Sequence, residues 1–254
     1  MGTPLQVNTA LLLVGGQATR LRPITLTTPK ALIPVQGTPI TEHILKHLIS
    51  QGITHFYFSV GYLKEKVMHY FGDGRKWGVK IEYLEENEPL GTAGPLNLLR
   101  GKLSSPFLML NGDVMSKIPV STLKGIHQKY SAKATITLVR VEDPSSYGVA
   151  RLAEDNSDRI TEFVEKPLRE QAPSNLINAG FYLLDPAVLD YVPQGRSMIE
   201  YKVFPKLAAE GSLYCYKYSG PWFDVGTPER LKEVKLVWDR PTQPKKSSGR
   251  KTPK

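Results

Sequence analysis

A short basic loop rich in glycine carries the residue types best suited to chemistry. Gly15 and Gly16 follow an apolar run of strand length at 10–14, and three cations follow in the same loop. These cations are Arg20, Arg22 and Lys30. Because glycine has no side chain, backbone N–H groups can approach phosphate oxygens closely, and the cations add positive charge. The loop is therefore predicted to bind a triphosphate.

The loop differs from the commonest phosphate-binding motifs. It lacks the Gly-Lys-Ser/Thr ending of a P-loop and the Gly-x-Gly-x-x-Gly of dinucleotide binders. A Gly-Gly pair alone is also compatible with a tight turn beside solvated cations. Three cations, Thr19, Pro23 and Pro29 within one short loop favour the binding interpretation.

Two aspartates are candidates for holding a divalent cation. Asp113 closely follows the apolar run 107–110, and Asp224 follows Trp222 and Phe223. Mg²⁺ prefers carboxylate oxygens together with substrate phosphate oxygens. The same two aspartates could instead cap a turn and precede a helix, which are ordinary duties for this residue. The residues alone leave both interpretations open.

The first half of the chain alternates helical and strand patterns. Apolar spacing predicts helices over 39–51 and 63–71, and strands over 55–60, 79–84 and 107–110. This alternation is typical of parallel βαβ units, in which ligands gather at the carboxyl ends of the strands. Both the glycine-rich loop and Asp113 are expected at such ends.

Beyond residue 133 the pattern changes to strands with shorter connections. The strands are predicted over 134–141, 148–152, 160–163 and 177–184, and a final helix over 228–237. We expect this mixed second half to form a wall of the same cleft.

Charge and composition exclude several classes of function. The chain has 254 residues and a formal net charge of +9, but residues 240–254 hold six Lys or Arg and no acid. Residues 1–239 hold 27 basic and 24 acidic residues, a net charge of +3, which argues against a nucleic-acid partner. We expect a single domain over 1–239 and a basic, disordered tail over 240–254.

The remaining composition fits a soluble cytoplasmic protein without a membrane partner. No apolar run approaches the roughly 20 residues that span a bilayer. The single cysteine, Cys215, cannot form an intramolecular disulfide and lies in an apolar, strand-like run, so an inert buried thiol is expected. Of the five histidines, only His43 and His47 have helical i,i+4 spacing, but Ile44 stands where a zincin motif has glutamate and no cysteines cluster nearby, so a zinc site is not expected.

Taken together, Gly15-Gly16, Thr19-Arg20 and Pro29-Lys30 resemble the nucleotide-sugar pyrophosphorylases, which make NDP-sugars from an NTP and a sugar 1-phosphate. The resemblance implies that Gly15, Gly16 and Thr19 wrap the triphosphate, that Arg20 contacts its pyrophosphate end and that Lys30 assists with charge. One position departs from the family pattern, which has glycine before the Thr-Arg pair where this chain has Ala18. A methyl group there would restrict the loop if the residue needs a positive φ.

The resemblance continues through the chain to about residue 239. It assigns Mg²⁺ binding to Asp113 and to Asp224 in Asp224-Val225-Gly226-Thr227-Pro228. In Glu165-Lys166-Pro167, it implies that Glu165 binds sugar hydroxyls and that Lys166 meets the sugar phosphate. It also places Gly148 and Asn178 in the sugar pocket. Glu165-Lys166 taken alone is compatible with an exposed acid–base pair at a strand end.

Residues 85–94 correspond to the segment that meets the base in this family. The residues implied in nucleotide binding there are Glu86, Gly91, Thr92 and Gly94. A carboxylate such as Glu86 can accept from both N1–H and the 2-amino group of guanine, whereas uracil and thymine offer one N3–H. Guanine is therefore the first choice of base.

Two runs, 174–180 and 203–207, look most like the mannose-1-phosphate guanylyltransferase branch of this family. The implied fold is an α/β, Rossmann-like three-layer sandwich with a mixed, mainly parallel sheet. The implied activity joins GTP to mannose 1-phosphate with Mg²⁺, releasing pyrophosphate, and a homo-oligomer is compatible with it. The alternatives are the same chemistry with UTP or dTTP and another sugar 1-phosphate, or a non-catalytic NDP-sugar-binding homologue. A glycosyltransferase is disfavoured because Asn111-Gly112-Asp113 stands where an Asp-x-Asp motif would be expected.

Overall fold

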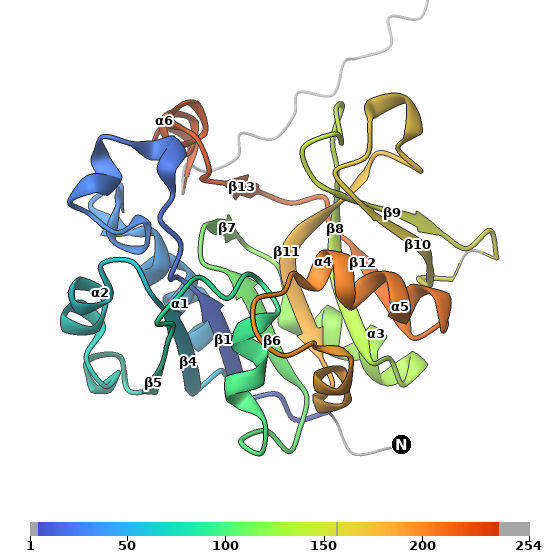
Figure 1. Ribbon diagram of the computed structural model, residues 1–254, viewed down its shortest axis with the longest axis horizontal. Coiled ribbons are helices and arrows are strands. Elements are labelled where there is room, and N and C mark those ends of the chain that lie inside the picture. The colour runs from blue at the N-terminus through green and yellow to red at the C-terminus, as the bar shows by residue number, and fades with distance from the viewer. Residues whose placement is uncertain (1–4, 156, 239–254) are drawn as a thin grey trace, which may run out of the picture.

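The apolar run after residue 8 forms the central strand of a mixed sheet. The computed structural model describes residues 5–155 and 157–238. Strand β1 (Thr9–Leu13) pairs in parallel with β4 (His55–Val60) on one side and with β6 (Phe107–Asn111) on the other (Figure 1). Strand β5 (Lys80–Glu85) continues the sheet beyond β4, also in parallel. The carboxyl ends of these strands therefore share one edge.

The other side of the sheet contains a strand that runs in the opposite direction. Strand β11 (Leu176–Leu184) is antiparallel to β6 and to β8 (Ala134–Arg140), and β12 (Leu213–Lys217) is parallel to β8. In the path β12-β8-β11-β6-β1-β4-β5, every strand except β11 thus runs in the same direction. The prediction of a mixed, mainly parallel sheet is confirmed.

Shorter strand pairs lie around this sheet. The hairpin of β9 (Gly148–Leu152) and β10 (Ile160–Glu165) joins it through β11. Two separate ribbons are formed by β7 with β13 and by β2 with β3. Their bounds are Val114–Ser116 for β7, Trp222–Asp224 for β13, Pro34–Val35 for β2 and Thr38–Pro39 for β3.

Alternating side chains of the strands build a core on each face of the sheet. Leu12 points to one core and Leu11 to the other, and both are fully buried. Each such side chain contributes about 1.5–3 kcal/mol to folding. Residues of α1, α2, α3 and α6 complete the first core, and residues of α4 and α5 complete the second. The fold is therefore the three-layer α/β sandwich predicted.

The helices agree with most of the predicted pattern. Their bounds are Ile40–Ser50 for α1, Lys64–Phe71 for α2, Val120–Tyr130 for α3, Ile199–Lys202 for α4, Phe204–Ala209 for α5 and Pro228–Val237 for α6. Short 3₁₀ helices cover Thr19–Leu21, Ile24–Leu26, Lys30–Leu32, Arg75–Trp77, Gly94–Leu99, Arg169–Gln171 and Pro186–Tyr191. Only α3, α4 and α5 were not predicted among the α-helices of the described residues.

Three further expectations concern the rest of the chain. Cys215 is fully buried in β12, and burial raises the pKa of its thiol to about 12, as expected for an inert cysteine. Among the helices within residues 5–155 and 157–238, none has the length and apolar character needed to cross a bilayer. The predicted tail, 240–254, lies outside the described residues.

Candidate active site

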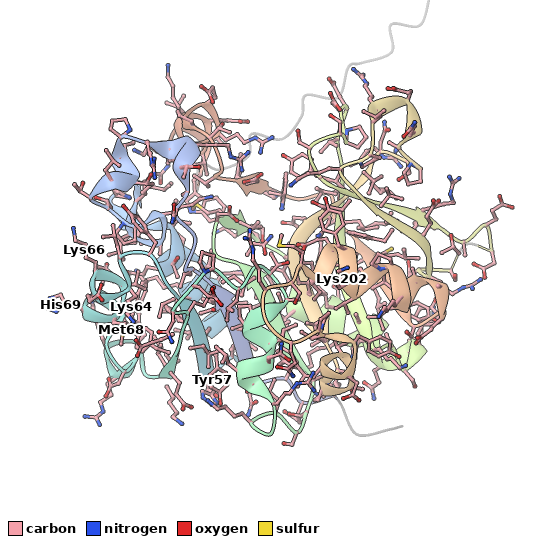
Figure 2. All side chains as sticks on the ribbon, viewed as in Figure 1. Tyr57, Lys64, Lys66, Met68, His69 and Lys202 are labelled. Atoms are coloured by element: carbon pink, nitrogen blue, oxygen red, sulfur yellow. The ribbon has the colours of Figure 1, made fainter. Side chains whose placement is uncertain are left out.

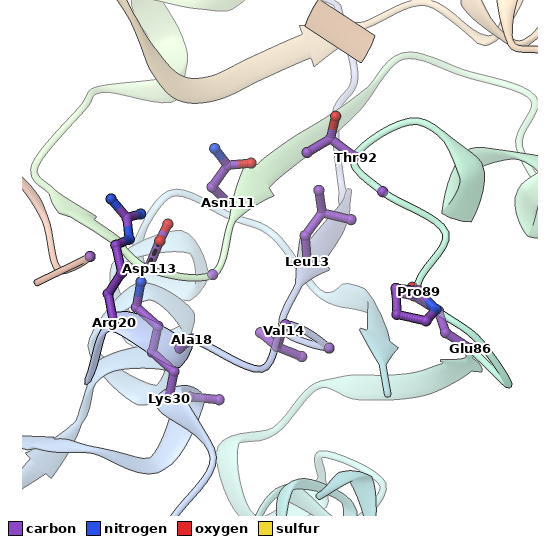
Figure 3. A pocket seen from close by; sticks show the side chains of 16 residues that line it. Leu13, Val14, Ala18, Arg20, Lys30, Glu86, Pro89, Thr92, Asn111 and Asp113 are labelled. Carbon is purple, nitrogen blue, oxygen red and sulfur yellow. Dashed lines mark hydrogen bonds and ion pairs between the residues drawn. The ribbon is translucent and has the colours of Figure 1, made fainter. Parts of the chain in front are cut away.

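A cavity of about 380 Å³ opens at the carboxyl ends of β1 and β6. Eight of the predicted site residues line it: Gly15, Gly16, Arg20, Lys30, Glu86, Gly91, Thr92 and Asp113. Figure 3 shows Arg20, Lys30 and Asp113 on one side of the cavity, and Glu86, Pro89 and Thr92 on the other. The side with Arg20 and Lys30 fits phosphates and leaves the opposite side for a base.

The two glycines of the loop have different constraints. A Cβ added to Gly15 would lie 2.8 Å from the backbone N of Gly61 and 3.1 Å from Glu86 Oε1, so the close packing requires glycine. A Cβ added to Gly16 would meet nothing within 4 Å. Gly15 thus lets the loop pack against its neighbours, while Gly16 leaves the backbone open to the cavity.

Ala18 has the backbone conformation that glycine adopts most easily. Its φ is 46° and its ψ is 50°, in the left-handed region. Its carbonyl accepts hydrogen bonds from the Leu21 N–H at 2.9 Å and from the buried Thr25 hydroxyl at 3.0 Å, which hold the turn in place. A left-handed conformation costs a residue with a Cβ about 1–2 kcal/mol. The position does need a positive φ, and the methyl group strains the loop.

Helix α2 supports this loop from the outside. The Lys66 ammonium donates to the Thr27 carbonyl at 2.5 Å, and the Lys64 ammonium lies 2.7 Å from Glu85 Oε2. Figure 2 shows both lysines near His69, on the outer side of the molecule. These exposed contacts connect α2 to the end of the glycine-rich loop and to β5.

Lys30 and Asp113 form an ion pair on one side of the cavity. Lys30 Nζ lies 2.5 Å from Asp113 Oδ2, and 14% of the lysine side chain and 30% of the aspartate side chain are exposed. The lysine comes from the Lys30–Leu32 turn and the aspartate from the turn after β6. A Cβ on the neighbouring Gly112 would lie 2.5 Å from the Leu13 carbonyl oxygen, so that turn packs directly against the end of β1.

Asp224 lies beside Asp113 although 111 residues separate them in the chain. Strand β13 pairs with β7 so that Asp224 is opposite Val114, and the Val225 N–H donates to the Asp113 carbonyl at 3.0 Å. Burial raises the pKa of Asp224, and the negative charge of Asp113 raises it further, while Lys30, Arg230 and Arg20 oppose the shift. The structure thus brings the two predicted acids together.

The two carboxylates suit a hard divalent cation that also binds substrate. Mg²⁺ commonly takes one or two protein carboxylates and fills its remaining positions with water and phosphate oxygens. Within the described ranges, no group of three or more His, Cys, Asp or Glu side chains could hold a metal alone. Asp113 and Asp224 therefore fit a Mg²⁺ ion that takes further ligands from a bound triphosphate.

Glu86 lies on the opposite side of the cavity, where its carboxylate holds residues 86–90 in place. Its Oε1 accepts from the Ser59 hydroxyl at 2.6 Å, and its Oε2 accepts from the Leu90 N–H at 2.9 Å. Each carboxylate oxygen can accept a second hydrogen bond. Glu86 is therefore fixed in position and retains capacity for a base.

Gly91 and Gly94 are required by packing against residues 195–198. Gly91 has φ +76°, and a Cβ there would lie 2.4 Å from the Ser197 carbonyl oxygen. A Cβ on Gly94 would lie 2.7 Å from the Leu90 Cβ and 2.9 Å from the Gly195 carbonyl oxygen. Gly94 does not line the cavity.

The Thr92 hydroxyl is already used inside the protein. It donates to Glu200 Oε2 at 2.5 Å and accepts from the Ile199 N–H at 2.9 Å. Glu200, which sequence reasoning missed, is 6% exposed, and burial raises the pKa of its carboxyl. Thr92 thus joins this side of the cavity to α4.

The predicted sugar-side residues lie together, outside the cavity lining. Glu165 and Gly148 face each other in the β9–β10 ladder, and Lys166 follows directly, its N–H donating to the Tyr147 carbonyl at 2.9 Å. Lys166 Nζ lies 3.5 Å from Glu165 Oε1; the lysine side chain is 59% exposed and that of the glutamate 8%. Burial raises the pKa of the Glu165 carboxyl, which Lys166 partly offsets.

Asn178 is held by its own strand. Its amide Nδ2 donates to the Tyr182 hydroxyl at 2.9 Å, and its Oδ1 accepts from the Gly180 N–H at 3.1 Å. Thr19, by contrast, is exposed at the start of the Thr19–Leu21 turn. Neither residue lines the cavity.

Arg230 is a second residue that sequence reasoning missed. Its Nη1 lies 2.6 Å from Asp224 Oδ2, and its guanidinium carbon lies 5.3 Å from the centre of the Tyr147 ring. The sequence held one local signal for Arg230, which is a cation in the first turn of a predicted helix, where it opposes the helix dipole. Such a position indicates a nearby acid or anion.

Comparisons with known proteins identify the family of the chain. The family model for nucleotidyl transferases matches residues 9–238. The mannose-1-phosphate guanylyltransferase catalytic subunit beta of Danio rerio is 42% identical over 224 residues, covering 87% of this chain and 61% of its own length. The mannose-1-phosphate guanylyltransferase of Mycobacterium tuberculosis is 41% identical over the same shares. The chain thus spans about 61% of the length of these curated relatives.

Solved structures show the same architecture. A protein described as a glucose-1-phosphate thymidylyltransferase of Bacillus anthracis, solved with sucrose, has a TM-score of 0.82 and 26% identity, over 91% of this chain and 94% of its own. A UDP-glucose pyrophosphorylase with UDP-glucose has a TM-score of 0.79 over 91% and 98% of the two chains, and its 22% identity supports the fold alone. With the family match spanning nearly all described residues, the chain belongs to the nucleotidyl transferase family.

Proposed function

We propose that this chain transfers a nucleotidyl group from GTP to mannose 1-phosphate, forming GDP-mannose and pyrophosphate. The observation that carries the proposal is the meeting of Arg20, Lys30, Asp113 and Asp224 beside the glycine-rich loop. The names of the relatives support the choice of GTP and mannose 1-phosphate.

The transfer needs no nucleophile from the protein. An oxygen of the sugar phosphate attacks the α-phosphorus, and the bond from that phosphorus to the bridging oxygen of the β-phosphate breaks. The electron pair leaves with pyrophosphate. Bound Mg²⁺, held by Asp113 and Asp224, would offset the negative charge at the α-phosphate.

Cations of the loop position the leaving group. Arg20 lines the cavity and can donate to the β- and γ-phosphates in a forked arrangement. Lys30 donates to Asp113 in this structure, and parting from Asp113 lets its ammonium donate to a phosphate instead. The backbone of Gly15 and Gly16, followed by Thr19, surrounds the triphosphate in this proposal.

The other side of the cavity is proposed to bind guanine. Glu86 keeps one acceptor position on each oxygen beyond its two internal hydrogen bonds, and these suit N1–H and the 2-amino group. Gly91 offers a surface without a side chain for the ring, and Gly94 and Thr92 hold the loop in place.

The sugar 1-phosphate is proposed to bind on the side of β9 and β10. Glu165 accepts from sugar hydroxyls, Lys166 donates to the phosphate, and Gly148 and Asn178 shape the wall. A cytoplasmic location is supported by the single, buried Cys215. A homo-oligomer stays a prediction.

The test is pyrophosphate release from four NTPs combined with several hexose 1-phosphates, in Mg²⁺. We expect the highest kcat/KM with GTP and mannose 1-phosphate. Preference for UTP or dTTP would overturn the base assigned through Glu86 but not the chemistry. Binding of GDP-mannose without any pyrophosphate release would identify a non-catalytic homologue instead.

A further inference from the structure

Arg230 occupies a position between the metal-binding side and the sugar side of the site. It lies in the first turn of α6, after the Thr227 cap and Pro228, six residues beyond Asp224 at the end of β13. Arg230 Nη1 lies 2.6 Å from Asp224 Oδ2. The guanidinium carbon of Arg230 also lies 5.3 Å from the centre of the Tyr147 ring.

A cation at the position of Arg230 is energetically unfavourable unless an anion lies nearby. The N-terminus of a helix carries partial positive charge, so an arginine in the first turn is repelled. Asp224 offsets this repulsion, but the guanidinium has five N–H donors, and Asp224 and Tyr147 engage only part of them. The Arg230 side chain is 36% exposed, against 17% for Asp224, so solvent and ligands can reach it.

Tyr147 connects Arg230 to the sugar-side residues. Its carbonyl accepts the Lys166 N–H at 2.9 Å, and Gly148 follows it in the chain. The Tyr147 ring also lies edge-to-face with Trp222, whose indole N–H donates to the Ala179 carbonyl at 2.9 Å. Tyr147 therefore connects Arg230 to the segment that carries Lys166, the residue proposed to meet the sugar phosphate.

We propose that Arg230 is a phosphate-binding residue for the sugar 1-phosphate, a role that rests on the proposed function. Its guanidinium presents paired donors that match phosphate oxygens, and its contact with Asp224 holds it beside the acid that would bind Mg²⁺. Arg230 and Lys166 then supply two cations for the attacking phosphate, while Arg20 and Lys30 serve the leaving pyrophosphate.

The test compares Arg230→Gln, Arg230→Lys and the control Lys232→Gln. Lys232 is an exposed cation on the same helix, so its loss changes the net charge equally without touching the site. Calorimetric binding is measured separately for mannose 1-phosphate, for mannose and for GTP, and thermal unfolding checks each variant for folding.

We expect Arg230→Gln to weaken mannose 1-phosphate binding by about tenfold or more, the size of one lost charge-assisted hydrogen bond. GTP binding should change by less than about threefold, and Arg230→Lys should show an intermediate loss because it keeps the charge but not the fork. Lys232→Gln should match the wild type.

Two results would overturn the role of Arg230 and leave the proposed function intact. One is undiminished mannose 1-phosphate binding in both Arg230 variants; the other is an equal weakening of GTP and mannose 1-phosphate, which indicates only a structural role through Asp224. If Arg230→Gln does not fold, Arg230→Lys still decides between these outcomes. A wild type that binds no sugar 1-phosphate would overturn the proposed function itself.

Discussion

The proposed nucleotide side and the proposed sugar side of the site differ in how their polar groups are satisfied. On the proposed nucleotide side, Arg20, Lys30 and Asp113 line the cavity, and Lys30 forms an ion pair with Asp113. On the sugar side, Asn178 is engaged within its own strand and Glu165 is 8% exposed. A ligand can enter the first side by exchanging ion-pair partners, whereas on the second it must compete with internal contacts.

This difference indicates where binding is preorganised. Charged groups that already face a cavity need little rearrangement to hold phosphates. The buried Glu165 carboxylate carries a desolvation penalty that Lys166 offsets only in part. We therefore expect changes on the nucleotide side to affect catalysis first and changes on the sugar side to affect folding as well.

The largest effect is expected on the nucleotide side, from Asp113→Asn. Loss of the carboxylate removes one of the two proposed ligands for Mg²⁺ and the partner of Lys30, so kcat for pyrophosphate release should fall by about 10³-fold or more. The free energy of unfolding should change little. The matched control is Asp190→Asn, because that carboxylate is 82% exposed and 3.8 Å from Arg100. Unchanged turnover in Asp113→Asn would remove the metal role.

On the sugar side, Gly148→Ala should destabilise the fold. The new Cβ would lie 2.4 Å from the Phe163 Cζ and 2.7 Å from Glu165 Oε2, so we expect a loss of about 2 kcal/mol in the free energy of unfolding. Denaturant unfolding measures it. The control, Gly125→Ala inside α3, meets nothing within 4 Å and should stabilise by about 0.5–1 kcal/mol. Equal effects in the two variants would show that the wall near Phe163 is not tightly packed.

Glu200→Gln tests the penalty carried by a buried acid. Burial raises the Glu200 pKa above 4.5, so the folded state binds a proton more readily than the unfolded state, and ionisation destabilises the protein as pH rises through that range. We expect Glu200→Gln to be more stable than the wild type at pH 7, by about 1 kcal/mol, while the Thr92 hydroxyl keeps an acceptor.

The advantage of Glu200→Gln should disappear as pH falls below about 4.5, where both states of the wild type bind the proton. Urea unfolding at pH 4, 5.5 and 7 measures the trend. Lower stability of the variant at every pH would mean that the ionised carboxylate is a net stabilising partner of Thr92.

Local patterns in the sequence determined most of the elements. Apolar alternation and helical spacing placed β9 and α6 at their observed bounds, and the glycine-rich loop was placed at the end of β1. These features depend on residues a few positions apart, so their signal lies within one window of the sequence.

Contacts between distant segments gave no such signal. Strands β7 and β13 have three residues each, and their pairing brings Asp224 to Asp113. The Thr92–Glu200 hydrogen bond joins residues 108 positions apart. Arg230 resembles an ordinary surface cation until the fold places it beside Asp224 and Tyr147. The family resemblance predicted Asp224, but only the structure shows which cations pair with the acids of the site.

The smallest effect returns to the nucleotide side, where Ala18→Gly should relax the phosphate loop. Glycine removes the cost of φ 46° but adds freedom to the unfolded chain, so the net gain in stability should be about 0.5 kcal/mol. GTP binding should tighten by about twofold, since less strain opposes the bound loop. The control is Ala209→Gly at the end of α5, where ordinary helical geometry makes glycine destabilising. Calorimetry and urea unfolding measure both variants, and weaker GTP binding in Ala18→Gly would show that the alanine methyl group orders the loop rather than straining it.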